Sequence, residues 1–247
     1  MKFVECKSTE IRQALEDKCV ILPVGSIEQH GPHLPLHVDM LLSEHLSLQL
    51  ANKINSVVLP AIPFFCRSLS FSGGGNDFDG NIYVKGHTAI EYMKDILTSL
   101  LRNGARQVMI LNGHYENEFP IFEAIEQLKE EGQLTCETIA ALSWWSVVDE
   151  SLIRDTFPGK FDGWHAEHAS VVETSMVMAI DEGLVNDIRV DNEEPPLNSL
   201  LLVTNRYAPL ASMGVLNKTS GSSAVAGQQV IDHVVDRLET LYQEKYL

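Results

Sequence analysis

The sequence has little positive charge. Its 247 residues include 18 Lys and Arg against 34 Asp and Glu, which gives a formal net charge of −16. A chain with this balance repels phosphate backbones, so we expect no nucleic-acid partner. The excess of acid favours solubility, and it remains compatible with a cation or a neutral, amidine-like small molecule as the ligand.

Cysteine is also scarce and is not arranged for metal or disulfide chemistry. The four cysteines are Cys6, Cys19, Cys66 and Cys136, and no two of them form a CxxC pair. This spacing excludes a zinc ribbon and a disulfide framework, and it favours reduced thiols in a cytoplasmic protein.

Long hydrophobic runs are missing as well. The longest apolar stretch, Val57–Cys66, contains two prolines and is too short to span a bilayer. The first residues, MKFVECKSTEIRQ, lack the uninterrupted apolar region of a signal peptide. We therefore expect a soluble cytoplasmic protein with no membrane partner.

Apolar patterns of strand and helix type alternate along the whole chain. Buried strands are expected at 19–24, 57–59, 107–111 and 138–142. Helices are expected at about 9–17, 39–54, 87–103, 119–131, 169–180 and 223–246, with Asp39 placed to cap the second. This alternation predicts one α/β domain over 1–247, with a mainly parallel sheet covered by helices on both faces. Residues 191–222 are expected to form an irregular surface excursion.

Three polar clusters follow the expected strands, where α/β folds gather their ligands. The first, PVGSIEQHGPHLPLHVD, carries Glu28, His30, His33, His37 and Asp39. The second is NGHYEN at 112–117, and the third is GWHAEH at 163–168, with Glu173 five residues later. Since the carboxyl ends of parallel strands share one edge, the three clusters should converge there.

Five of these residues form a donor set for two divalent ions. Glu28 and His30, like His114 and Glu116, are two apart, so each pair can face one side of an extended segment. With Asp39 they offer too many ligands for one tetrahedral zinc with an open position. They suit two ions that share Asp39, hold a hydroxide between them and polarise a carbonyl.

Other histidines remain open alternatives or have structural interpretations. His33 and His37 are equally good ligands by chemistry alone. His45 and His87, on or beside helices, are expected at the surface or in caps, and His233 is expected to be structural.

The third cluster and the tryptophans could provide proton transfer and substrate contacts, which metal ions do not provide. Glu167 and His168 could act as an acid/base pair for a leaving nitrogen, or could cap the helix beginning at Ala169. Trp144, Trp145 and Trp164 lie near strand ends, where they could form flat walls for a small planar substrate or pack in the core. The glycine-rich turn at 72–76 lacks the Lys-Ser/Thr of a phosphate loop, so its backbone could instead approach a metal-bound substrate.

The motifs PVGSIEQHGPHLPLHVD, SGGGN, NGHYEN and GWHAEHASVVETS together resemble the creatininase (creatinine amidohydrolase) family over nearly the full length. The resemblance implies a three-layer α/β/α fold, a homohexamer, and two zinc or manganese ions per chain. It implies that Glu28, Asp39 and His114 hold one ion, and that His30, Asp39 and Glu116 hold the other.

The resemblance also implies roles around the substrate. The residues implied to contact it are Ser72, Tyr115, Trp144, Trp164 and Glu167. His168 would shuttle the proton, and we place Glu116 and Glu167 with it in the catalytic set. The implied reaction is the reversible opening of creatinine to creatine.

Two departures from the family pattern bear on the substrate. Many relatives have NGHGGN where this chain has NGHYEN, as creatininase does. Creatininase has an Asp after the third-cluster Trp, however, where this chain has His165, which we also expect to face the substrate. A histidine cannot pair with a guanidinium-like group as an aspartate does. A lactam, a hydantoin-like ring or a cyclic keto-polyol is therefore an alternative substrate, and a non-catalytic metal-binding protein is the alternative of another class.

Overall fold

A parallel sheet forms the centre of the computed structural model, which describes residues 1–73, 75–135, 137–193 and 213–246. Its strands are β1 (Cys19–Val24), β2 (Ser56–Val58), β3 (Gln107–Asn112) and β4 (Thr138–Ser143). Their order is β2-β1-β3-β4, and each neighbouring pair is parallel. The predicted parallel sheet is confirmed.

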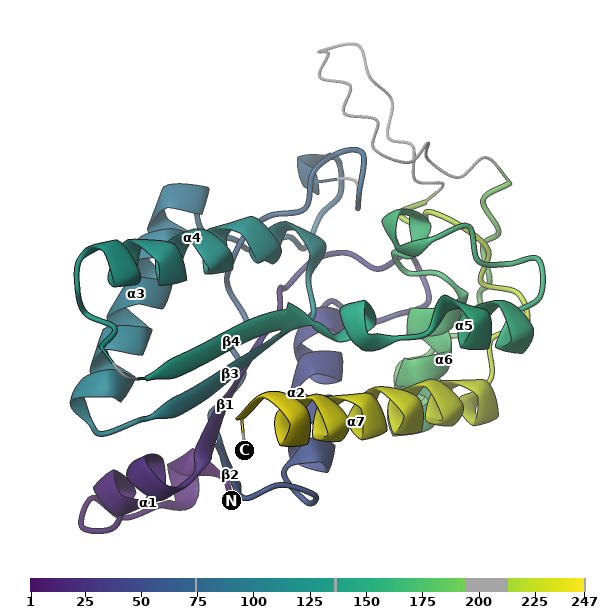
Figure 1. The fold of residues 1–247 in the computed structure, drawn as a ribbon. Coiled ribbons are helices and arrows are strands. Elements are labelled where there is room, and N and C mark those ends of the chain that lie inside the picture. The colour runs from purple at the N-terminus through teal and green to yellow at the C-terminus, as the bar shows by residue number, and fades with distance from the viewer. Residues whose placement is uncertain (74, 136, 194–212, 247) are drawn as a thin grey trace.

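Helices cover both faces of this sheet. They are α1 (Ile11–Asp17), α2 (Val38–Leu50), α3 (Gly86–Arg102), α4 (Glu118–Glu130), α5 (Glu150–Thr156), α6 (Val171–Ile180) and α7 (Ala224–Tyr246). Short 3-10 helices are η1 (Phe3–Glu5), η2 (Gly75–Asp77), η3 (Tyr115–Asn117), η4 (Trp144–Val147), η5 (Trp164–Ala166) and η6 (Glu182–Leu184). Helices α3 and α4 lie on one side of the sheet, and α2, α6 and α7 lie on the other (Figure 1).

The strand sequences explain the three layers. Successive strand residues point to opposite faces, so a strand buried on both sides must be apolar throughout. Ile21 and Met109 pack into the core beneath α2, α6 and α7, whereas Val20 and Ile110 pack against α3 and α4. The expected α/β/α architecture is confirmed.

Helix α2 begins differently from the prediction. It starts at Val38 with His37 in the N-cap position, and no side chain caps it. The cap predicted for Asp39 is wrong, because this carboxylate turns toward two histidines instead. The predicted excursion at 191–222 lies largely outside the described residues, at 194–212.

The strands set where the polar loops begin. Val24 of β1 is in register with Asn112 of β3, and Asn112 is in register with Ser143 of β4. The loops that follow therefore leave the sheet at one level. Within the described residues, none of the helices is both long and apolar enough to cross a membrane.

Candidate metal centre and catalytic cavity

The loop after β1 presents Glu28 and His30 as buried side chains. The Nδ1 atom of His30 donates to the backbone oxygen of Glu28 at 3.2 Å, so Nε2 is the nitrogen that faces Asp39. Burial lowers the pKa of His30, but the charge of Asp39 raises it, to about 9, so a metal ion at Nε2 would replace a proton. A backbone acceptor of this kind is the usual device that orients a metal-binding imidazole. His30 is therefore preset to offer Nε2.

Asp39 lies between two histidines, His30 in the loop after β1 and His114 in the loop after β3. Its Oδ1 atom is 3.1 Å from His30 Nε2, and its Oδ2 atom is 3.1 Å from His114 Nδ1. Burial raises the pKa of Asp39, but the two imidazoles lower it by more than burial raises it. The pKa is therefore held below its ordinary value. An ionised carboxylate with one oxygen toward each histidine has the arrangement needed to bridge two cations.

His114 completes the first group of potential ligands. Its Nδ1 atom lies 3.1 Å from Glu28 Oε1 and from Asp39 Oδ2, and all three side chains are buried. The second oxygen of Glu28 is buried with no hydrogen-bond partner. A buried carboxylate oxygen left in this state is costly, and a divalent cation would satisfy it. The donor set therefore fits a metal ion.

Glu116 lies on the far side of His114. Its Oε2 atom is 3.2 Å from His114 Nε2, while Oε1 accepts hydrogen bonds from the Leu69 backbone, at 3.1 Å, and from the Ser72 hydroxyl. Burial raises the pKa of Glu116. Its assignment as a ligand remains a prediction, because this carboxylate is not grouped with His30 and Asp39.

Glu173, in the first turn of α6, completes the group around His30 and Asp39. Its Oε2 atom lies 3.9 Å from His30 Nε2 and accepts a hydrogen bond of 2.7 Å from the Ala169 backbone. Burial raises the pKa of Glu173 to about 7, against the opposing charge of His30. Glu173 is therefore the alternative to Glu116 as a third ligand.

The other histidines of the sequence lie outside these groups. His33 is buried with Nε2 2.9 Å from the Thr174 hydroxyl, and His37 occupies the N-cap of α2, so both shape the first loop. His45 lies on α2 and His87 in the first turn of α3. His233, on α7, accepts a hydrogen bond of 3.3 Å from the Asp149 backbone.

Glu167 caps the start of α6 and also lines the cavity. Its Oε1 atom accepts hydrogen bonds from the backbones of Val172, at 2.7 Å, and Glu173, at 3.2 Å, which is the capping role weighed from sequence. Its Oε2 atom is buried without a partner. Burial and the charge of Glu173 raise the pKa of Glu167 well above its ordinary value. Both effects favour the protonated form of this carboxyl.

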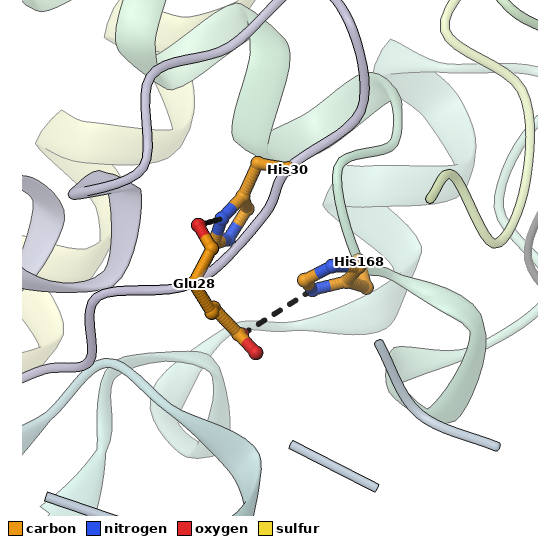
Figure 2. Close-up of side chains that lie close together, drawn as sticks. All are labelled: Glu28, His30 and His168. Carbon is orange, nitrogen blue, oxygen red and sulfur yellow. Dashed lines mark hydrogen bonds and ion pairs between the residues drawn. The ribbon is translucent and has the colours of Figure 1, made fainter. Parts of the chain in front are cut away.

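His168 forms a third group of potential ligands, with Glu28 and His30. Its Nδ1 atom lies 3.7 Å from Glu28 Oε1, and its ring centroid is 4.4 Å from that of His30 (Figure 2). Burial and the charge of His30 lower the pKa of His168 to about 4. The imidazole is therefore neutral in the arrangement seen here.

An aromatic cavity of about 280 Å³ opens beside these carboxylates and histidines. Its lining includes every residue implied to contact substrate: Ser72, Tyr115, Trp144, Trp164, His165 and Glu167. The ring of Trp144 meets those of Trp145 and Trp164 edge to face, with centroids 5.5 and 5.4 Å apart. Such walls accept a flat ring of a few atoms.

Some lining residues were not singled out from the sequence. Ser68 is buried with its hydroxyl unpartnered, and Phe71, Phe119 and Leu216 supply further apolar surface. Phe71 and Phe119 had a local signal, since they lie beside the glycine-rich turn and the NGHYEN motif. The others reach the cavity through long-range folding.

Buried groups of glutamate, aspartate and histidine at the edge of a parallel sheet, beside an enclosed cavity, define a metal-dependent α/β hydrolase. The sequence model of the family described as creatininase, creatinine amidohydrolase, matches residues 4–242. The chain therefore belongs to the creatininase family, and it is a metal-dependent hydrolase that acts on amide C–N bonds.

Curated relatives differ in the substrates that they are named for. The chain is 32% identical to the creatinine amidohydrolase of Pseudomonas putida, covering 97% of this chain and 94% of that protein. It is 30% identical to the 3-dehydro-scyllo-inosose hydrolase of Thermotoga maritima, over 95% and 80%. It is 26% identical to a mycofactocin precursor peptide peptidase of Mycobacterium ulcerans, over 88% and 81%.

Solved creatininase structures share the fold. A manganese form superposes with a TM-score of 0.91 at 30% identity, over 99% of this chain and 98% of that one. A Glu-to-Gln creatininase variant complexed with creatine gives the same values. A Zn-Zn form gives a TM-score of 0.90 at 31% identity, with the same coverage.

Proposed function

We propose that this protein opens a small cyclic amide, and that creatinine, converted reversibly to creatine, is the substrate. The observation that carries the proposal is the cavity itself, because four of the five predicted metal ligands and the three tryptophans line one small space. The similarity to the Pseudomonas putida creatinine amidohydrolase supports the choice of ring.

Two divalent ions, zinc or manganese, are proposed as cofactors. Glu28, Asp39 and His114 would hold one ion, and His30, Asp39 and Glu116 the other, with Glu173 as the alternative to Glu116. Two such ions supply Lewis acidity toward a carbonyl oxygen and a nucleophile at neutral pH.

The side chains of this protein supply orientation and the proton. Trp144 and Trp164, which pack edge to face, would form the wall against which the flat ring lies, and Ser72, Tyr115 and His165 would contact its periphery. Hydrolysis adds OH to the carbonyl carbon and H to the departing nitrogen. Glu167, whose raised pKa favours its protonated form, would give that hydrogen, and His168 would move the proton to and from the site.

A second candidate is the opening of another small polar ring, such as a lactam, a hydantoin-like ring or a cyclic keto-polyol. The observation that favours it is His165, which lines the cavity where creatininase has an aspartate. The Thermotoga maritima relative, named for a keto-polyol derivative, is consistent with this.

The decisive experiment is turnover by the purified protein loaded with manganese or zinc. Creatinine and one representative of each alternative ring are assayed in parallel, and the metal content is measured on the same sample. We expect creatinine to be opened by a protein that holds two ions. Hydrolysis of another ring with no action on creatinine would refute the creatinine assignment. One bound ion or none, with no turnover, would favour a non-catalytic metal-binding protein.

Several broader features belong to the same proposal. We propose a single domain over 1–247 that forms a homohexamer in the cytoplasm and has neither a nucleic-acid nor a membrane partner. Phe119 supports assembly, since it lines the cavity yet is 79% exposed in the isolated chain. Light scattering of the purified protein tests the oligomer, and a monomer would contradict it.

A further inference from the structure

Gln29 stands between two predicted metal ligands, Glu28 and His30, and the proposed function gives it no role. Its side chain is buried, and its backbone nitrogen donates to Asn81 Oδ1 at 2.9 Å. Its amide group contacts four separate parts of the chain. Such a concentration of hydrogen bonds on one neutral side chain points to a positioning task.

The contacts fix which way the amide points. Its Oε1 atom accepts a hydrogen bond of 2.8 Å from the backbone of Gly31. Its Nε2 atom donates to the backbone oxygens of Gly73, at 2.5 Å, and Gly214, at 3.0 Å. The opposite orientation would set the amide oxygen against two carbonyl oxygens and the amide nitrogen against an N–H. The network therefore assigns Nε2 to the side of Gly73 and Gly214.

The same Nε2 atom lies 2.9 Å from Nε2 of His168. An amide nitrogen donates hydrogen bonds and does not accept them, so the ring nitrogen opposite it must be an acceptor. The amide has two N–H groups for three acceptors, so one of its hydrogens is shared between two of them in a three-centre bond. The proton of the neutral imidazole is then on Nδ1. That atom lies 3.7 Å from Oε1 of Glu28, on the side of the metal groups (Figure 2).

Close backbone contacts keep the amide in place. A Cβ atom added to Gly214 would lie 1.8 Å from Gln29 Oε1, and one added to Gly73 would lie 3.1 Å from Cε1 of His168. The glycines at these two positions therefore let the backbone close around Gln29 and His168. This gives the glycine-rich turn a task that involves no phosphate.

We propose that Gln29 is a positioning residue that holds His168 in the Nδ1–H tautomer, so that His168 exchanges its proton with the cavity at Nδ1. The proposal rests on the role of His168 in the proposed function. It adds which ring nitrogen acts and which residue decides this. Gln29 does not line the cavity and belongs to none of the groups of potential metal ligands, so its role is positioning.

The test replaces Gln29 in the zinc-loaded protein and reads the tautomer directly. In Gln29→Glu, a carboxylate would face His168 Nε2 and draw the proton to that atom. Nitrogen-15 NMR of protein labelled at histidine, with His168→Asn used for assignment, distinguishes the two ring nitrogens. We expect Nε2 to be the unprotonated nitrogen in the wild type and the protonated one in Gln29→Glu.

Turnover supplies the second readout. We expect kcat to fall about 10- to 100-fold in Gln29→Glu while KM changes by less than about 3-fold, since proton transfer and not binding is impaired. Gly214→Ala should give the same signature, because its Cβ displaces the amide. The control is Asn81→Ala, which removes another anchor of the loop but does not touch His168. It should keep the tautomer and keep kcat within about 2-fold.

The outcomes separate this inference from the proposed function. A wild-type spectrum with Nε2 protonated overturns the inference, whatever the turnover. An unchanged tautomer in both Gln29→Glu and Gly214→Ala also overturns it. If the wild type has the Nδ1–H tautomer and the variants lose it, the inference stands even if the protein opens no ring of the panel, in which case the proposed function fails alone.

Discussion

The Nε2 atom of His30 lies 3.1 Å from the Oδ1 atom of Asp39, and both side chains are buried. We predict that Asp39→Asn loses metal at both positions, because a neutral amide cannot bridge two cations. Metal content should fall below half that of the wild type, and turnover should fall at least about 100-fold. Elemental analysis of dialysed protein measures the content, with the exposed Asp95→Asn on α3 as the control. Two ions retained in Asp39→Asn would contradict the bridge.

A second prediction distinguishes the two carboxylates that compete for one ion. Glu116→Gln should lose one of the two ions and nearly all turnover, since its carboxylate is the predicted ligand beside His114. Glu173→Gln should keep both ions, because Glu173 Oε2 already accepts a hydrogen bond from Ala169. The opposite pattern of metal contents would make Glu173 the ligand and Glu116 a partner of Ser72.

Gly113 should tolerate no side chain. A Cβ at this position would lie 2.3 Å from the backbone oxygen of Asp39. Gly113→Ala must therefore displace the start of α2, and we expect it to lower the free energy of unfolding by about 1–3 kcal/mol and to weaken metal binding. Gly86→Ala is the matched control, because nothing lies within 4 Å of its added Cβ. Urea unfolding of the two variants measures the difference, and equal stabilities would show that the contact relaxes freely.

The residue at position 165 should affect which cyclic substrate the enzyme prefers. Replacing the half-buried His165 by aspartate supplies a carboxylate for a guanidinium-like group, and we expect kcat/KM for creatinine to rise about 10-fold. His165→Asn has a similar shape without the charge and should not show this gain. A neutral lactam assayed alongside should be unaffected by the aspartate. A gain shared by both variants would indicate a steric cause and not an electrostatic one.

His33 should make stability depend on pH. Burial, and then the charges of Arg189 and His30, lower its pKa from 6.5 to about 4 in the folded protein. Between these values the unfolded chain binds the proton first, so the stability that neutral His33 contributes is present above about pH 6.5 and is lost toward pH 4. The free energy of unfolding should fall by up to about 1 kcal/mol per pH unit relative to His33→Leu. Urea titrations across this range, with His87→Ala as the control, measure it, and parallel curves would exclude the effect.

The sequence predicted those features that depend on residues close together in the chain. The strands around Ile21 and Met109 are continuous apolar runs, so their burial and parallel pairing could be inferred directly. Glu28, His30 and His114 follow those strands immediately, and the structure brings them together. The capping role of Glu167 was foreseen as an alternative, because it lies just before a helix.

Other features depend on distances that no spacing encodes. The choice between Glu116 and Glu173 depends on how α6 approaches the first loop, which is set by packing far from either residue. The task of Gln29 requires Gly214 to fold back from 185 positions away. The wrongly predicted helix cap at Asp39 has a similar origin, because one partner of this carboxylate, His114, comes from the loop after β3.

The sheet order separates two tasks that one enzyme must combine. Glu28 and His114 lie in the loops after β1 and β3, in the middle of the sheet. Trp144 directly follows β4, which is the outer strand on its side of the described sheet. Substitutions near the end of β4 therefore need not disturb the predicted metal ligands after β1 and β3. A lineage can therefore acquire new substrates by rebuilding the border of the sheet while its inherited reactive centre is kept, which accords with relatives named for creatinine, an inosose and a peptide.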